Sequence, residues 1–163
     1  MHFTKTLISL VTIATLALIP SVSGDVGVHC GTTDDATLSD CHALVDDEGA
    51  WNAAFNTGNT CSFVNPFGPL GPLPQTAWNV ACKGDCCVYV AGVTGGDVIS
   101  RDQTRQEAQG LLGCGDAGAN KINGMQKFDD GHGVCFSNGN GCGDCFDDAG
   151  ECFGKPRQTG PAC

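Results

Sequence analysis

Cysteine is the residue type whose number and spacing point most directly to chemistry, with 12 in the 163-residue chain. The spacing of Cys82 and Cys86, and that of Cys142 and Cys145, would suit a metal site or, for the second pair, a redox centre. A dense, even set of cysteines in a secreted chain instead predicts a disulfide framework of up to six bridges. The predicted disulfide residues, with pairing undetermined, are Cys30, Cys41, Cys61, Cys82, Cys86, Cys87, Cys114, Cys135, Cys142, Cys145, Cys152 and Cys163.

The neighbouring cysteines Cys86 and Cys87 open an apolar segment typical of a strand. Adjacent residues of a strand point to opposite faces of the sheet. Cys86 is therefore expected to face the core and to bridge to a helix, with Cys41 or Cys114 as its partner. Cys87 is expected to tie down a loop or tail on the other face.

His132, in the stretch FDDGHGVC, is the best candidate for acid–base chemistry because Asp129 and Asp130 lie close by. Other carboxylates also occur next to one another in the sequence. Glycoside hydrolysis instead needs two carboxylates that face each other across a cleft, so these neighbouring residues do not predict a glycosidase. A secreted ribonuclease would need a His/Glu/Arg constellation and cationic recognition of phosphate. Nucleophile elbows, zinc-protease helices and phosphate-binding glycine loops are absent from the sequence. We therefore predict no catalytic residue and no cofactor.

The alternating oxygen-bearing residues of 138–144 are similar to the first half of a calcium-binding loop. Cys142 interrupts the alternation of ligands, and Ala149 stands where such a loop needs a glutamate. We therefore predict no metal site.

The N-terminus has the pattern of a secretory signal peptide: a basic start, the apolar run Thr6–Ile19 and small residues after it. We expect cleavage after Gly24, with cleavage after Ser23 nearly as favourable. Residues 25–163 would then form a single extracellular domain stapled by disulfides, which we expect to be monomeric. Stable membrane insertion is not expected.

The charge of the chain limits its partners. Loss of Lys5 with the signal leaves 7 Lys and Arg against 18 Asp and Glu, a formal charge of −11. Because an acidic surface repels phosphate backbones, nucleic acid is not an expected partner. The expected partner is an extracellular target: a protein, a glycan or a cell surface.

Two segments have the features of helices. In the first, Thr37 is placed as N-cap before an apolar stripe that starts at Leu38 and fades near Gly49. In the second, Ser100 and Gln103 have capping-box spacing, and an inner stripe from Thr104 follows before Gly113 stops the helix. That stripe comprises Thr104, Ala108, Leu111 and Leu112.

Short strands are predicted between and after these helices, at Thr60–Val64, Asn79–Cys82, Cys86–Ala91 and Val134–Ser137, with 121–128 left ambiguous. The order of elements predicts an α+β fold, a small disulfide-rich αβ sandwich in which two main helices pack on an antiparallel sheet.

The loop Asn65–Gln75 (NPFGPLGPLPQ) is proline-rich and has three bulky apolar residues. It either packs back on the domain or exposes an apolar finger to a ligand. Trp51 and Trp78 are expected in the core, although a tryptophan or tyrosine ring could also stack on a ligand. The candidate binding surface comprises Phe67, Leu70, Leu73, Trp78, Tyr89 and His132.

The segment His29–Trp51 resembles the start of the fungal secreted necrosis-inducing effector family, with an early Cys, an Asp-Cys pair on a first helix and then a Trp. The stretches 58–63, 87–92, 96–99 and 121–124 follow in that family's order, so the resemblance spans roughly residues 29–125. It implies the small αβ sandwich that viral killer toxins of fungi share. Acidic, cysteine-rich domains also occur among mushroom glycan-binding proteins.

The chain departs from the family in its cysteine count and in its cysteine-rich end. Killer toxins depend on basic surface residues, and here only five could serve, so channel blocking is not expected. These are Lys83, Arg101, Arg105, Lys121 and Lys127.

The sequence therefore predicts a secreted, non-enzymatic protein of effector or toxin type that acts on another organism or a competitor. The alternative is a glycan-binding, lectin-like protein, and an enzyme such as a glycosidase or ribonuclease comes third.

Overall fold

The strand β5 (Cys86–Ala91) lies in the middle of a six-stranded sheet, and all of its residues are buried. The computed structural model describes residues 27–31, 35–65, 73–93, 98–139 and 142–147. Across the sheet the order is β1-β7-β8-β5-β4-β3, and every neighbouring pair is antiparallel. The other strands are β1 (Val28–Cys30), β3 (Thr60–Asn65), β4 (Leu73–Lys83), β7 (Gly124–Lys127) and β8 (Gly133–Ser137).

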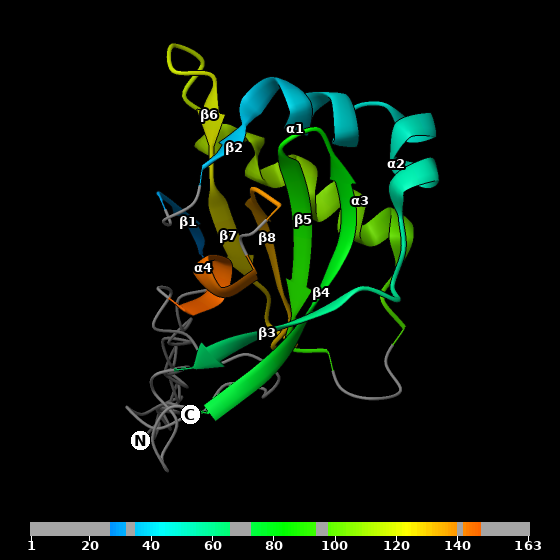
Figure 1. Ribbon diagram of the computed structural model, residues 1–163, viewed down its shortest axis with the longest axis vertical. Helices are drawn as coiled ribbons and strands as arrows, with labels where there is room; N and C mark the ends of the chain where they lie inside the picture. The colour runs from blue at the N-terminus through cyan, green and yellow to red at the C-terminus, as the bar shows by residue number, and fades with distance from the viewer. Residues whose placement is uncertain (1–26, 32–34, 66–72, 94–97, 140–141, 148–163) are drawn as a thin grey trace, which may run out of the picture.

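Helices cover both faces of this sheet. One face carries α1 (Leu38–Val45), α2 (Glu48–Ala54) and α3 (Arg101–Gly110), and the other carries α4 (Cys142–Asp147) (Figure 1). The 3₁₀ turn η1 (Leu111–Cys114) continues α3. The predicted α+β class and antiparallel sheet are thus confirmed.

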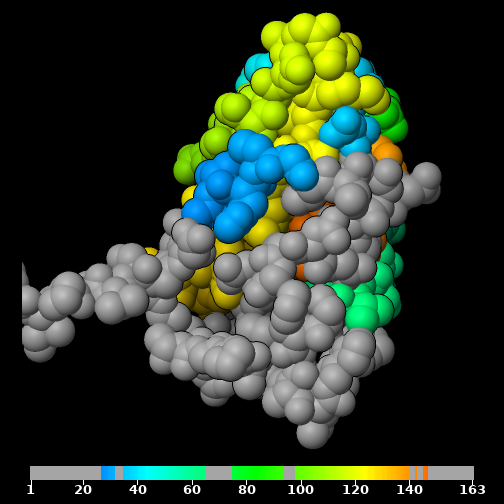
Figure 2. All heavy atoms as spheres, turned by 90° about the vertical axis from the view of Figure 1, so that its left-hand side faces the viewer, coloured from blue at the N-terminus to red at the C-terminus, as the bar shows by residue number. Residues whose placement is uncertain are grey.

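The edge of the sheet at β1 is short. Figure 2 looks at this side, where β1 (blue) lies against the yellow segment that contains β6 (Lys121–Ile122) and β7. A separate pair of short strands, β2 (Ala36–Thr37) and β6, lies beside the N-terminus of α1. The ambiguous region 121–128 is therefore two strands. None of the helices in the described part of the chain is long and apolar enough to cross a membrane.

The side chains of β5 alternate between two hydrophobic clusters, as a strand covered on both faces requires. Cys86, Val88 and Val90 pack under α1, α2 and α3. Cys87 and Tyr89 pack with Phe146 of α4 on the opposite face. The predicted division of the two neighbouring cysteines between the faces is confirmed.

The described residues contain five disulfides and no free cysteine; four of the bridges join the sheet to a helix or to η1, and the fifth joins two neighbouring strands. Cys86 bridges to Cys41 of α1, which is one of the two partners expected for it. Cys87 does not tie down a distant loop: it pairs with Cys82, which is directly opposite on β4. The remaining bridges are Cys30–Cys114, Cys61–Cys142 and Cys135–Cys145, while Cys152 and Cys163 lie outside the described residues.

The short turn between β4 and β5 explains why Cys87 pairs with Cys82 and not with a distant loop. Gly84 has φ +58°, as the first position of a type II′ hairpin turn requires, and Asp85 completes the turn. A two-residue turn at this place sets Lys83 opposite Cys86 and Cys82 opposite Cys87.

Cys142 and Cys145 bond to different partners, so they do not form a redox pair with one another.

Helix α2 was not predicted, because its polar start was interpreted as the end of α1. Asp47 is its N-cap, and its side chain accepts a hydrogen bond from the backbone N–H of Ala50 at 3.0 Å. Trp51 is fully buried, as predicted, and its indole N–H donates to the carbonyl oxygen of Arg101 at 3.0 Å. The buried ring and this bond compensate for a glycine in the first turn. Helix α4 was missed as well, because it is short and two disulfides hold it.

Strand β4 begins earlier than predicted and includes part of the proline-rich loop. Its first residues, Leu73–Thr76, pair only with β3, since pairing with β5 starts at Ala77. A proline is tolerated where only one side of a strand is paired, which explains how Pro74 is accommodated. Only 66–72 of the predicted loop therefore separates β3 from β4.

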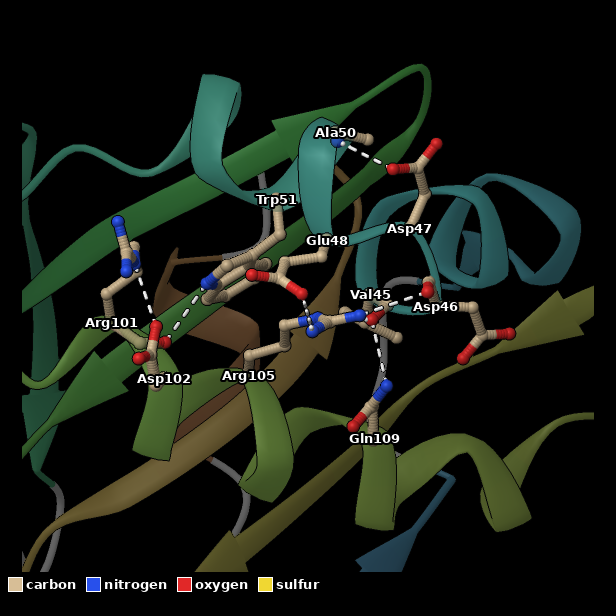
Figure 3. Close-up of polar contacts among 10 residues, drawn as sticks. All are labelled: Val45, Asp46, Asp47, Glu48, Ala50, Trp51, Arg101, Asp102, Arg105 and Gln109. Carbon is tan, nitrogen blue, oxygen red and sulfur yellow. Dashed lines mark hydrogen bonds and ion pairs between the residues drawn. The ribbon is translucent and has the colours of Figure 1, made fainter.

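Both ends of α1 are held by distant segments. At its N-terminus, Thr37 makes no capping bond with its side chain, and the backbone N–H of Ser39 donates to Oδ1 of Asn120 at 3.0 Å instead. At its C-terminus, Arg105 Nε and Gln109 Nε2 donate to the carbonyl oxygen of Val45 at 2.7 and 2.9 Å (Figure 3). These contacts fix α1 against α3 and the loop before β6.

Candidate functional site

A pocket of about 350 Å³ opens between the end of β5, the first half of α3 and the turn from β7 to β8. Its walls combine aliphatic side chains with carboxylates, an amide and hydroxyl groups, the composition usual for a ligand site. The lining residues are Val90, Gly92, Val93, Val98, Ile99, Ser100, Gln103, Thr104, Glu107, Asp130 and His132.

The α3 wall of the pocket follows from helical periodicity. Ser100, Gln103, Thr104 and Glu107 recur at the spacing of one helical face and all line the pocket. Ser100 caps the helix as predicted, with its hydroxyl oxygen accepting from the backbone N–H of Gln103 at 3.4 Å. Thr104 lies where this face meets the buried stripe, which is why it is itself buried.

The opposite wall is the turn that holds His132. Gly131 has φ +95°, a conformation that favours glycine, and its N–H donates to the carbonyl oxygen of Phe128 at 3.0 Å. The imidazole ring stacks on the Phe128 ring, with 4.4 Å between centroids and 8° between planes. The turn thereby points His132 at α3.

Two carboxylates bond the ring nitrogens of His132. Nε2 lies 3.1 Å from Oε2 of Glu107, and Nδ1 lies 2.5 Å from Oδ1 of Asp130. The other oxygen of Glu107 accepts from Nε2 of Gln103 at 2.7 Å. The four side chains form one hydrogen-bonded chain along the pocket. His132 and Glu107 are each only 12% exposed, whereas Asp130 is 67% exposed.

The pKa values of this cluster follow from its pairing. Burial lowers the pKa of His132, but the hydrogen bonds and charges of Glu107 and Asp130 outweigh burial and raise it above 6.5. Burial raises the pKa of Asp130, but the backbone N–H and the ring of His132 outweigh that effect and lower it below 3.8. The two carboxylates therefore stabilise the charged imidazolium, which can donate from both nitrogens, more than solvent would.

The residues of the predicted binding surface are not brought together. His132 lies in the pocket, while Trp78 is half-buried against the core below α1–α3. The prediction that Tyr89 belongs to a binding surface is wrong, because this residue is only 1% exposed. It packs on the α4 side, where its hydroxyl donates to the carbonyl oxygen of Asn138 at 2.8 Å. Leu73 begins β4, and Phe67 and Leu70 lie outside the described residues.

Sequence reasoning found His132 and Asp130 but missed Glu107 and Gln103. The signal for them was present, because both lie on the helical face that Ser100 begins, beside the predicted inner stripe. Nothing in the sequence says that this face meets the turn before β8. That contact depends on the position of α3 across the sheet.

No group of three or more His, Cys, Asp and Glu residues in the described ranges is arranged to hold a metal ion. In the His132 cluster the reason is geometric. Glu107 and Asp130 contact different nitrogens of one imidazole ring, so their oxygens do not converge on a common point with that ring.

Several basic residues on which a killer-toxin surface would depend have structural contacts. Arg105 binds the end of α1, and Lys83 Nζ donates to the carbonyl oxygen of Ala43 at 3.1 Å. Arg101 pairs with Asp102 at 2.8 Å.

Comparisons of the chain with protein-family models, curated proteins and solved structures find no match.

Proposed function

We propose that this chain is a secreted, non-enzymatic protein of effector or toxin type, which binds a component of another organism's cell surface. The observation that carries the proposal is the pocket between β5, α3 and the β7–β8 turn, a preformed site on a scaffold whose described part contains five disulfides. Many disulfides and the absence of a membrane-spanning helix from the described residues are compatible with a secreted protein.

The contacts of His132 favour binding over catalysis. A general base needs an unprotonated nitrogen that faces the substrate. Here both ring nitrogens are bonded to carboxylates, and these partners raise the pKa of the ring, so neither nitrogen is free to face a substrate. The imidazolium thus holds the β7–β8 turn to α3 and shapes the pocket wall.

The test is to apply the oxidised protein, residues 25–163, to living plant and fungal cells and to measure growth and dye uptake. We expect a saturable effect on one cell type that is lost when the protein is reduced and alkylated. A folded sample that neither binds nor affects any of these cells would overturn the proposal. Release of products from polysaccharides or RNA would replace it with an enzymatic function.

The second candidate, a glycan-binding protein, is favoured by the carboxylate, amide and hydroxyl groups of the pocket, which can bond vicinal hydroxyls. A glycan array with the oxidised protein tests it, with reduced protein as control. Strong binding to one sugar class, lost on reduction, would establish this candidate in place of the first.

A further inference from the structure

We infer that the pocket between β5, α3 and the β7–β8 turn binds an alkylammonium or guanidinium group, such as the side chain of a lysine or arginine on a partner. This inference rests on the proposed binding function and specifies the ligand chemistry of the same pocket. It depends on the charges, the aliphatic wall and the hydrogen-bonded cluster of the described lining residues.

The charge balance of the pocket is negative. Among the residues that the structure describes, its lining includes the carboxylates of Glu107 and Asp130 and no lysine or arginine. When His132 is protonated the three groups together have a formal charge of −1. Asp130, at 67% exposure, is the carboxylate that can reach a ligand while its Oδ1 still contacts the ring. A cation is therefore attracted to this wall.

An anion is not favoured at the end of α3 that borders the pocket. The hydroxyl oxygen of Ser100 already accepts from the backbone N–H of Gln103, so that donor is used within the chain. Asp102 and Arg101, which both lie in the first turn, pair at 2.8 Å and add no net charge there. The carboxylates of Glu107 and Asp130 therefore dominate the charge of the described lining.

The aliphatic wall matches the methylene groups of a long basic side chain. Val93 and Ile99 are partly buried against the core, and Val98 beside them is 89% exposed. Lysine and arginine bury their aliphatic stems on apolar surface while the charged end stays at polar groups. The described lining contains no phenylalanine, tyrosine or tryptophan on which a sugar ring could stack, which favours this ligand over a glycan.

The experiment uses methyl-labelled protein, residues 25–163, oxidised and at neutral pH. The methyl resonances of Val93, Val98, Ile99 and Thr104 are followed by NMR during titration. The ammonium and guanidinium probes are N-acetyl-lysine methylamide and N-acetyl-arginine methylamide, the neutral control is N-acetyl-norleucine methylamide, and the sugar arm is N-acetylglucosamine. We expect saturable changes in chemical shift, with dissociation constants in the millimolar range, for the two cationic probes only.

The variants test the two walls separately. Asp130→Asn should weaken binding of the lysine probe about five- to tenfold, and the neighbouring exposed Asp129→Asn is the matched control that should not. Val98→Ser should weaken it about two- to fivefold, since it shortens the aliphatic wall. Because Val98 is exposed, this variant stays informative even if Asp130→Asn disturbs the turn.

The outcomes are distinct. Spermidine that binds more tightly than a lysine-containing peptide assigns the pocket to free polyamines, and the reverse assigns it to a protein partner; both support the inferred chemistry. Equal shifts with norleucine, no shifts with either cation, or saturable binding of the sugar alone would overturn it. Cation binding without any effect on living cells would remove the proposed function and leave this inference in place.

Discussion

Arg105 of α3 donates from Nε to the carbonyl oxygen of Val45, the last residue of α1, at 2.7 Å. Its Nη2 donates to the next carbonyl oxygen, that of Asp46, at 3.0 Å. A guanidinium at the C-terminus of a helix satisfies free carbonyl groups and the negative end of the dipole together. Figure 3 shows that this contact and the bond from Trp51 to the backbone of Arg101 join three helices at one place.

The Arg105 contact predicts a specific loss of stability. Arg105→Met, which retains most of the aliphatic stem, should lower the free energy of unfolding by about 2 kcal/mol, because charge-assisted hydrogen bonds to partly buried carbonyl groups are lost. Urea denaturation of the oxidised protein measures this. The control is Arg101→Met, which removes a guanidinium that pairs with Asp102 on the surface and should change little. Equal losses in the two variants would contradict the capping role.

The end of α1 opposite Arg105 gives a second prediction. Asn120→Ala should cost about 1 kcal/mol, because Ser39 loses the acceptor of its backbone N–H. Thr37→Ala should cost less, although Thr37 holds the N-cap position, since its side chain makes no capping bond. Thermal and urea unfolding compare the two variants. Asn120 also has φ +53°, so Asn120→Gly separates loss of the acceptor from backbone strain. A larger loss in the Thr37 variant would disprove this assignment.

The disulfides should contribute unequally. In the chain-entropy model, removing Cys41–Cys86 with two alanines should cost about 4 kcal/mol and removing Cys82–Cys87 about 2 kcal/mol. The reason is that the first bridge joins residues 45 apart and the second residues only 5 apart, in strands that the hairpin already pairs. Urea unfolding of each double variant, with the other bridges intact, provides the comparison. The reverse order would show that native-state contacts, not loop closure, decide the difference.

The His132 cluster predicts a pH dependence of stability. Because the pKa of His132 is raised, the ring contributes to the free energy of unfolding. This contribution is complete below pH 6.5 and is lost as the pH rises through the pKa of His132 in the folded state. Because the pKa of Asp130 is lowered, its carboxylate contributes stability that is present above pH 3.8. This contribution is lost as the pH falls through the pKa of Asp130 in the folded state. The cluster should therefore stabilise the fold most between pH 3.8 and 6.5.

The variant that tests this window is His132→Gln, with His42→Gln as control, since His42 also bonds a carboxylate but on an exposed helix face. Unfolding free energies are measured from pH 3 to 9. The difference between the native protein and His132→Gln should reach about 1–2 kcal/mol in mild acid, from its charge-assisted bonds, and shrink at alkaline pH. A difference that stays constant across the range would mean that packing on Phe128, not charge, stabilises the turn.

Some features of the fold could be predicted because they depend on neighbours along the chain. The alternation in β5 placed Cys86 and Cys87 on opposite faces, and the stripe of α1 put Cys41 within reach of the first of them. Helix α2 was missed because its polar first turn is stable only with Trp51 buried beside α3. The partner of Cys87 was missed because it depends on strand register, which the turn at Gly84 decides.

The sequence by itself determined the α+β class, the N-cap positions Thr37 and Ser100, and a cysteine framework. These follow from local periodicity, capping chemistry and composition. Only the tertiary structure decided which groups meet. It sets Asn120 and Arg105 at the two ends of α1 and joins His132 to Glu107 in one pocket. The physical reason is that such contacts link residues 25 to 81 positions apart, and the packing of helices on the sheet sets their distance.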